Sequence, residues 1–432
     1  MKHNTHHHII AAVLLSMAIL PAVQGADYFL RAEEYVRVMP DGAAVTMWGY
    51  ALDSSFSAGD GVPTSPGPVL TVPPGDSSLT LFLDNNLAVA TSLMVMGQTT
   101  PHPRRLDDGR ARAFTAEIPA GNVTPAKYRW TGLRPGTYLY QSGSHPAVQV
   151  QMGLYGAAVV DYLPGQAYDH PEGAYDNEVV LLLSEIDPRL HAAVAGGEYG
   201  PGRAVTSTID YTPRYFLFNG QTFADASSIQ AGVPGQRTLV RFLNAGLETH
   251  TPMLLGAAMT LIAEDGYPRS HWTESYSLLL PAGGTMDAVM QVDTAGYYTL
   301  IDRSLNVRDD KRPGGMMVYL AFAGDGYRRL QIVRSGRGLG SIEVVGLPGG
   351  ISCGDDCEEE YIAGTEVLLR ALAEPGHRFA GWSGGGCTGT GDCLIRLDDD
   401  VRIKAGFFPD KKQKPAFRSL GAVTGGFTSW GG

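Results

Sequence analysis

Residues 135–160, PGTYLYQSGSHPAVQVQMGLYGAAVV, constrain the fold more than any other stretch of the chain. Residues 137–140 form an apolar, aromatic run that leads into a polar loop carrying His145. A Gly- and Val-rich run follows at residues 153–160. Runs of this kind, separated by turn residues, are typical of β-strands. The stretch therefore predicts two strands joined by a loop that holds a candidate ligand-binding histidine.

Similar short strand-like runs recur along most of the chain. With 55 Gly and 27 Pro residues among 432, and no long amphipathic helix, the sequence predicts an all-β protein of sandwich or barrel type. Its length suffices for two or three cores. We expect domains at residues 26–165, 176–325 and 328–409, and a flexible tail at 410–432. The expected strands include residues 44–50, 69–72, 79–83, 113–118, 179–183, 215–220, 236–243, 258–262, 276–280, 288–292, 297–302 and 316–322.

The N-terminus has the pattern of a cleaved signal peptide at residues 1–25. Lys2 precedes an apolar run at residues 9–20, and small residues before Ala26 offer a cleavage site. A buried N-terminal helix is the alternative. No other stretch is long and apolar enough to span a membrane. The net charge of -11 argues against nucleic acid or an anionic membrane surface as a partner. We expect an exported, soluble protein.

The four cysteines, Cys353, Cys357, Cys387 and Cys393, all lie in the last fifth of the chain. Export and an even number favour disulfides. Of the three possible pairings, the short spacings favour Cys353 with Cys357 and Cys387 with Cys393. A zinc site made by all four thiolates is the weaker alternative.

Residues 27–325 resemble the two-domain members of the multicopper oxidase superfamily, which are built from cupredoxin domains. The resemblance rests on the segments at residues 65–70 (SPGPVL), 74–76 (PGD), 135–138 (PGTY), 152–156 (MGLYG), 218–221 (FNGQ), 241–246 (RFLNAG), 264–266 (EDG) and 281–283 (PAG). It implies two Greek-key, cupredoxin-like β-sandwiches or barrels, and it allows copper as a cofactor.

The positions that carry copper ligands in this family are largely occupied by other residues. Blue-copper sites need a thiolate and two imidazoles, and the family's oxygen-reducing cluster needs paired histidines. The corresponding segments here read MVMG at 94–97, YQSGSH at 140–145, HTPMLLG at 250–256 and IDRS at 301–304. Cysteine is absent before Cys353, so neither cupredoxin-like domain can form a thiolate copper site. The resemblance therefore implies a degenerate member that has lost the oxidase reaction, with no catalytic residues to assign.

A non-standard copper site is the alternative. Thioethers suit Cu(I), and the candidate ligands are His145, His250, Met94, Met96 and Met253. Each also has a structural interpretation: methionine fills core volume, His145 belongs to an exposed loop, and His250 is a satisfied core histidine. Asp302 and Arg303, where the family has ligands, are interpreted as an ion pair or a solvated turn.

The last part of the chain resembles a bacterial repeat related to the internalin B repeat. The resemblance rests on residues 338–342, 350–357, 371–384, 387–393 and 405–408. It implies a small, disulfide-stapled β-rich module used as a spacer or interaction unit, with Trp382 anchoring the core.

The sequence thus predicts an exported, multicopper-oxidase-like protein with a non-catalytic role in binding or assembly. A copper-binding protein or oxidoreductase with a Met/His site is the second hypothesis. The resemblance places the protein in the periplasm, in the secreted fraction or on the surface of a bacterium. It also allows a homotrimer, whose interface residues the sequence does not identify.

Overall fold

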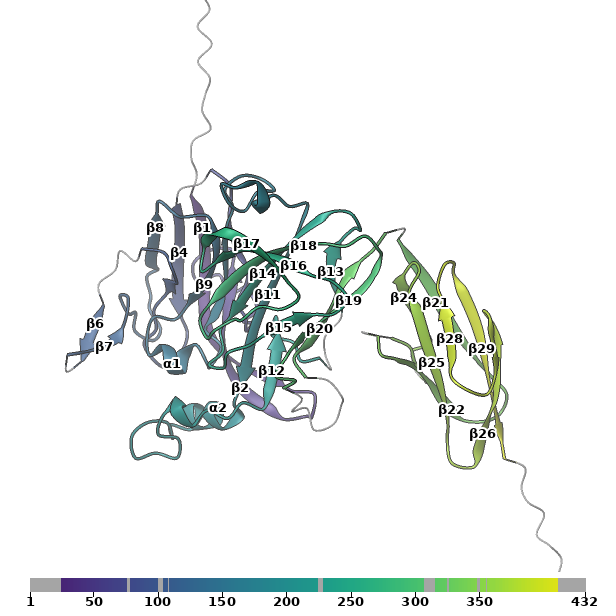
Figure 1. Ribbon diagram of the computed structural model, residues 1–432. Helices are drawn as coiled ribbons and strands as arrows, with labels where there is room; N and C mark the ends of the chain where they lie inside the picture. The colour runs from purple at the N-terminus through teal and green to yellow at the C-terminus, as the bar shows by residue number, and fades with distance from the viewer. Residues whose placement is uncertain are drawn as a thin grey trace, which may run out of the picture. The chain divides into compact units, whose positions relative to one another are not determined.

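The computed structural model describes residues 25–75, 78–99, 104–107, 109–223, 228–306, 315–324, 326–347, 350–354 and 356–410. Within them the chain is mostly β-structure, which confirms the all-β prediction (Figure 1). The predicted signal peptide and tail lie almost wholly outside the described residues. No helix in the described ranges is long and apolar enough to cross a membrane. The chain divides into two compact units, Met1–Phe322 and Ala323–Gly432.

The first half of unit 1 contains two four-stranded sheets and a small hairpin. One sheet has the strand order β2 (Ala44–Asp53), β1 (Ala26–Val38), β4 (Ser78–Asn85), β8 (Ala126–Thr131). The other has the order β3 (Leu70–Val72), β10 (Tyr155–Val160), β9 (Gly136–Gln141), β5 (Met94–Val95). The hairpin pairs β6 (Arg105–Asp107) with β7 (Arg110–Ala113). Inward-facing aromatic and aliphatic side chains of both larger sheets form one core, with Trp130, Tyr50 and Tyr140 fully buried.

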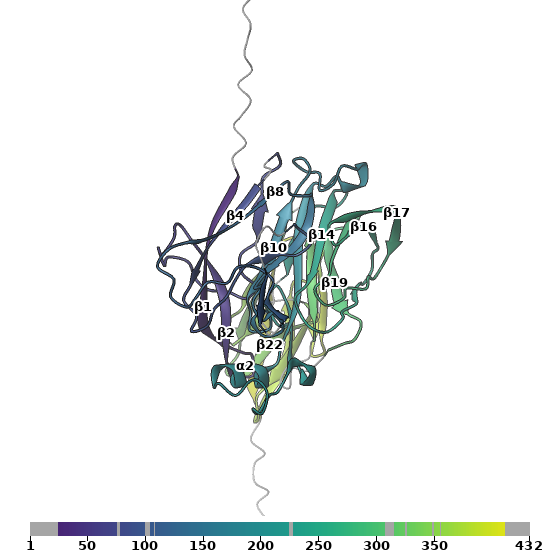
Figure 2. The ribbon, with the colours of Figure 1, turned by 90° about the vertical axis from the view of Figure 1, so that its left-hand side faces the viewer.

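The second half of unit 1 contains a six-stranded and a four-stranded sheet. The larger has the order β12 (Tyr215–Phe218), β11 (Asn177–Ile186), β14 (Arg237–Asn244), β18 (Thr285–Gln291), β16 (Met259–Glu264), β17 (Tyr267–Ser275). The smaller has the order β13 (Ile229–Gly232), β20 (Met317–Phe322), β19 (Gly296–Asp302), β15 (Pro252–Leu254). Figure 2 shows β17 on the flank of unit 1 opposite β1 and β4.

The two halves repeat one topology. The order β2-β1-β4-β8 corresponds to β12-β11-β14-β18, and β3-β10-β9-β5 corresponds to β13-β20-β19-β15. The parallel pairs correspond as well: β1 with β4 and β11 with β14, β3 with β10 and β13 with β20. Equivalent positions in the halves can therefore be compared through the strand registers.

The halves pack against each other through apolar side chains of β9 and β10 on one side and β11 and β14 on the other. The shared cluster consists of Leu139, Val150, Tyr155, Ala157, Leu182, Leu243 and Ala245. A buried charged group, centred on Arg241, lies in the same interface: its Nη1 donates to Thr137 Oγ1 of β9 at 3.0 Å. Unit 1 is thus held together by apolar and ionic contacts between its halves.

Helices in unit 1 are short. They are α1 (Pro146–Gln149), α2 (Pro188–Ala195) and the 3₁₀ turns η1 (Pro171–Gly173) and η2 (Thr208–Asp210). Helix α2 was not predicted, although the sequence contains its start signal. Asp187 is the N-cap, and its Oδ1 accepts from Arg189 N and Leu190 N. Pro188 follows the cap, as is common at the first position of a helix. The strand predicted at residues 113–118 was wrong, because β7 ends at Ala113 and beyond it only Ile118 forms an isolated bridge. The strand predicted at residues 276–280 was also wrong. Strand β17 lies just before it, and residues 277 and 280 form isolated bridges only.

Unit 2 is a two-sheet β-structure with its own core. One sheet has the order β24 (Glu358–Ile362), β21 (Tyr327–Ser335), β29 (Val401–Pro409), β26 (His377–Gly384), β27 (Cys387–Gly389). The other has the order β23 (Ser352–Cys353), β22 (Gly340–Val345), β25 (Glu366–Ala373), β28 (Cys393–Arg396). The predicted disulfides are present, pairing Cys353 with Cys357 and Cys387 with Cys393. Trp382 is buried in the core and donates its indole N–H to Gly391 O at 2.7 Å.

Candidate functional site

The repeated topology identifies Thr91 and His250 as equivalent residues. Asn85 ends β4 and Asn244 ends β14, and each side chain donates to a carbonyl four residues later, Val89 O and Glu248 O, at 2.8 Å. Thr91 and His250 follow these asparagines at the same spacing. Both are fully buried. The side chains that surround Thr91 and His250 differ between the two halves.

In the second half, His250 lies between two buried carboxylates. Its Nε2 is 2.5 Å from Glu185 Oε1 and its Nδ1 is 3.0 Å from Asp302 Oδ2. The side chains of all three residues are fully buried. Asp302 was expected to lie in a solvated turn or to pair with Arg303. It is instead buried and pairs with His250, because β19 carries it inward beside β15.

The electrostatics of this Glu185–His250–Asp302 triad favour a protonated imidazole. Burial alone would lower the pKa of His250, but hydrogen bonds to Asp302 and Glu185, with their negative charges, raise the pKa to about 9. The pKa of Asp302 is lowered, because its hydrogen bonds from His250 and Thr251 N outweigh burial. A buried cation between two buried anions suits a structural ion network.

The triad also connects to the interface between the halves. Glu185 Oε2 accepts from Leu247 N at 3.0 Å and from the Tyr211 hydroxyl at 3.3 Å. The Tyr211 hydroxyl also lies 3.2 Å from Gln151 Oε1, and Gln151 Nε2 donates to Ala245 O at 3.0 Å. Gln151 follows α1 in the first half, so this chain of hydrogen bonds joins the triad to the His145 loop.

In the first half, hydroxyl and amide groups take the place of the triad. Thr91 Oγ1 donates to Gln149 Oε1 at 2.7 Å, and Ser142 Oγ donates to the same oxygen at 2.6 Å. Gln149 Nε2 donates to Ala90 O at 2.8 Å, and Ser144 Oγ donates to Ser92 Oγ at 3.0 Å. The network is neutral and closes the loop that was predicted to hold a metal ligand.

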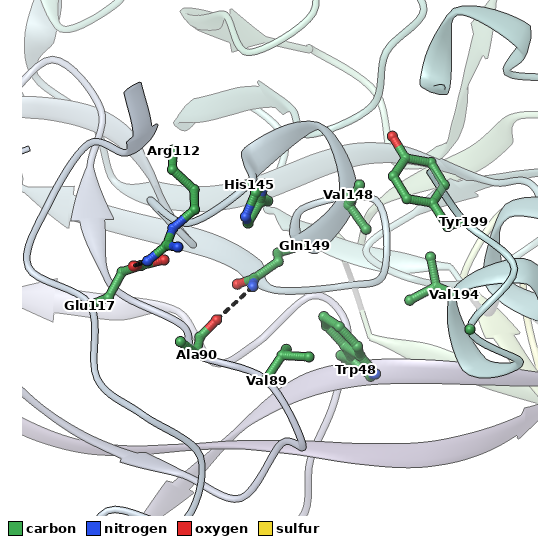
Figure 3. Close-up of a pocket in the computed structure, with 11 residues that line it drawn as sticks. Trp48, Val89, Ala90, Arg112, Glu117, His145, Val148, Gln149, Val194 and Tyr199 are labelled. Atoms are coloured by element: carbon green, nitrogen blue, oxygen red, sulfur yellow. Dashed lines mark hydrogen bonds and ion pairs between the residues drawn. The ribbon is translucent and has the colours of Figure 1, made fainter. Parts of the chain in front are cut away.

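Beside this network lies a pocket of about 430 Å³ (Figure 3). It is lined by both halves of unit 1. Its apolar walls are Trp48, Val89, Ala90, Val148 and Val194; the remaining lining residues are Arg112, Glu117, His145, Gln149, Gly197 and Tyr199. We call it the His145 pocket.

Local structure fixes the orientation of the pocket's main side chains. The indole N–H of Trp48 donates to Glu34 Oε2 at 3.3 Å. His145 has a left-handed backbone (φ 39°) and begins α1, with its amide bonded to Arg112 O at 3.0 Å. Its ring is exposed, and the hydrogen bonds of the described residues include none to either ring nitrogen. His145 is therefore positioned to meet a ligand from solvent.

The ion pair of Arg112 with Glu117 also lines the pocket. Arg112 Nη2 lies 2.5 Å from Glu117 Oε2 and Nη1 lies 2.9 Å from Asp107 Oδ2. Figure 3 shows Arg112 and Glu117 together on the side of His145 away from Tyr199. The Nε of Arg112 is buried and has no hydrogen-bond partner. The pocket thus presents apolar walls, an exposed imidazole and one unused buried donor, a combination suited to a small organic ligand.

The three candidate methionines lie in different surroundings. Met94 pairs with Gln141 at the edge of a sheet, and a Cβ added at Gly143 would lie 3.6 Å from Met94 Sδ, so this sulfur lies beside the His145 loop. Met96 packs against the apolar cluster between the halves. Met253 pairs with Ile301 in the second half. A site shared by all five candidates therefore remains a prediction.

Glu185 is the residue that sequence reasoning missed. It lies at the end of the buried strand β11, where carboxylates are rare unless paired. An acidic residue at the buried end of an apolar run was the available signal, but its partner His250 is 65 residues away. The parallel pairing of β11 with β14, whose last pair is Leu183 with Asn244, brings the segments that carry them together.

Comparisons with known proteins agree with this fold. Two family models, both described as multicopper oxidase, match residues 63–164 and 178–319. The blue copper oxidase of Nitrosomonas europaea superposes with a TM-score of 0.54 at 18% identity, over 69% of this chain and 86% of that chain. The likeness shows the cupredoxin-like fold.

Curated relatives align with part of the chain. Multicopper oxidase MmcO of Mycobacterium tuberculosis is 30% identical over 265 residues, or 55% of this chain and 48% of that protein. Copper resistance protein A of Escherichia coli is 29% identical over 171 residues, or 40% of this chain and 24% of that protein. The chain therefore spans half or less of these relatives. It belongs to the multicopper oxidase family.

The donor set of the chain does not fit the thiolate copper centre that this family implies. All four cysteines of the sequence form disulfides in unit 2. Both ring nitrogens of His250 face carboxylate oxygens, so binding a metal there would require displacing one of them. In the described ranges, no group of three or more His, Cys, Asp or Glu side chains has an arrangement that could hold a metal ion, and this includes the Glu185–His250–Asp302 triad.

Proposed function

We propose that this protein is a copper-independent, non-catalytic binding protein on a multicopper oxidase fold, and that the His145 pocket is its ligand site. The observation that carries the proposal is the neutral network of Thr91, Ser142 and Gln149 beside the pocket. This network satisfies its buried polar groups with one another, without a metal. The triad at the equivalent place in the second half does so with a proton on His250.

The lining of the pocket supports a ligand that is mainly apolar. Trp48 offers a large aromatic side chain and valines line the walls, whereas Arg112 is already paired with Glu117 and Asp107. A strongly charged ligand would have to compete with that pairing. An uncharged molecule with one hydrogen-bond acceptor could use the unpartnered Nε of Arg112.

Copper binding is the competing function. The relatives' names include a copper resistance protein, and Met94 Sδ lies beside the His145 loop. A Cu(I) site made by Met94 and His145 would use thioether and imidazole donors. Both functions use the same loop, so one experiment has to separate them.

The test uses the purified full chain. It is incubated with Cu(I) under reducing conditions and with Cu(II) in air, dialysed, and assayed for bound copper and for oxygen consumption with a phenol. The neutral dye Nile red, whose emission rises in apolar surroundings, is then titrated in. We expect substoichiometric copper, no oxygen consumption and a saturable rise in emission.

Matched variants locate the dye. Val194→Trp fills the pocket, whereas Ala192→Trp adds the same bulk to an exposed position on the same helix. Emission should fall several-fold only in Val194→Trp. Stoichiometric Cu(I) that is lost in Met94→Leu, or dye binding that Val194→Trp leaves unchanged, would overturn the proposal.

We further propose that the protein is exported through the signal peptide at residues 1–25. We also propose that unit 2 is an internalin B-type repeat that acts as a spacer or interaction module. The disulfides of unit 2 support an oxidising compartment. Homotrimer formation is proposed on family resemblance alone. Mass measurement of the mature exported protein tests the cleavage site, and light scattering tests the assembly state.

A further inference from the structure

A second pocket, of about 580 Å³, lies where the halves of unit 1 meet and shares no lining residue with the His145 pocket. Its lining comes from β1, from the loop before β3 and from the turn after β12. The lining residues are Tyr35, Arg37, Val38, Pro63, Thr64, Ser65, Pro66, Asn219, Gly220 and Gln221. They include one cationic side chain and no carboxylate. We call this the Arg37 pocket.

Arg37 has no counter-ion in the described part of the chain. The salt bridges there include none to Arg37, although it is only partly exposed. The nearest carboxylates on its own strand are engaged: Glu33 pairs with Arg31, and Glu34 accepts from Trp48. A half-buried guanidinium without a counter-ion is costly unless a ligand supplies the negative charge.

Two phenol groups lie near the positive charge of Arg37. Burial raises the pKa of both Tyr35 and Tyr155, and the charge of Arg37 opposes that rise in each, so both phenols lie near Arg37. Ser65 lines the pocket, and its Oγ is buried with no partner at hydrogen-bond geometry among the described residues, although it lies close enough to the Tyr155 phenol to lower the pKa of that group. Buried hydroxyls without partners are uncommon in proteins. The guanidinium of Arg37 and the unpartnered hydroxyl of Ser65 therefore line the same pocket.

The walls are built by a close approach of the two halves. A Cβ at Gly220 would lie 2.5 Å from Ser65 O and 2.7 Å from Pro66 Cδ, and Gly220 has φ +74°. Only glycine fits this contact without strain. The loop that carries Ser65 is therefore fixed against the turn of the second half, and the pocket exists before any ligand binds.

We propose that the Arg37 pocket binds the carboxylate group of a small organic acid. The guanidinium fork matches a carboxylate in two parallel hydrogen bonds, and a serine hydroxyl can add a third. One cation balances one negative charge, whereas a phosphate dianion would leave charge uncompensated in a chain of net charge -11. Tyr35, Pro63 and Pro66 provide apolar surface for the rest of the ligand.

The test compares benzoate with benzamide, its uncharged analogue of the same shape, and with inorganic phosphate, by calorimetric titration of the full chain. We expect benzoate to bind more tightly than either. Arg37→Gln should weaken benzoate binding about tenfold, consistent with the loss of a charged hydrogen bond. Arg189→Gln, which removes an exposed arginine on α2, should leave it unchanged.

Further variants keep the result interpretable. If Arg37→Gln does not fold, Arg37→Lys retains the charge, loses the fork and should give a smaller loss. Val194→Trp, which blocks the His145 pocket, should leave benzoate binding intact. Equal affinities for benzoate and benzamide, tighter binding of phosphate, or full benzoate binding by the arginine variant would overturn the proposal.

Discussion

At the scale of single residues, His250 decides how the second half of unit 1 responds to pH. The pKa of its imidazole rises from an ordinary 6.5 to about 9 in the folded protein. The stability it contributes is therefore fully present below pH 6.5 and is lost as the pH rises through about 9. We expect the free energy of unfolding to fall by about 3 kcal/mol between pH 6.5 and 9.5 from this group. Urea unfolding at a series of pH values measures it, and a flat profile would contradict the charged triad.

Replacing His250 should be more damaging than neutralising it. In His250→Gln the carboxylates of Glu185 and Asp302 stay buried without a cation. Loss of one partner from a buried ionic group costs about 3–5 kcal/mol. The loss should be largest at neutral pH, and the pH dependence between pH 7 and 9 should largely disappear. The exposed histidine variant His271→Gln provides the control and should unfold like the parent chain.

At the scale of elements, local patterns predicted the strands well, and the misses have physical causes. The apolar runs in β11 and β14 and the Gly-Thr-Tyr start of β9 identify strands from neighbouring residues alone. Strand β17 was missed because it is an edge strand exposed on both faces, so it lacks an apolar alternation. The candidate site was less predictable, because Glu185, His250 and Asp302 meet through pairings of distant strands.

The interface between the halves depends on Arg241 of β14. It is fully buried and lies among Asp161, Asp287 and Glu178, carried by or next to three other strands. Arg241→Met should lower the free energy of unfolding by about 3–5 kcal/mol, because three carboxylates lose their counter-ion. Arg269→Met removes a partly exposed pair with Glu264 and should cost about 1 kcal/mol or less. Comparable losses in the two variants would contradict a central role for Arg241.

At the scale of the whole molecule, the cores of the two units share no residue among those described. Calorimetry of the full chain should therefore show separate unfolding transitions for Met1–Phe322 and Ala323–Gly432. Both disulfides belong to the second unit, so agents that reduce them should act on one transition only.

The disulfide prediction can be made quantitative. Cys387 and Cys393 are separated by six positions, and closing so short a loop contributes about 2 kcal/mol through the entropy of the unfolded chain. Cys387→Ser combined with Cys393→Ser should therefore lower the Tm of unit 2 by about 10 °C, the scale expected for a domain of this size. Burial of Cys387 adds to the loss, because a serine hydroxyl there needs a partner. The cores of unit 1 contain neither cysteine, so the unfolding transition of unit 1 should not shift in this variant.

The same scan tests for copper. If the chain binds no copper, copper added before the scan should shift neither transition. A shift of unit 1 on adding Cu(I) to the oxidised protein would instead indicate a copper site formed by the methionines and histidines of the fold.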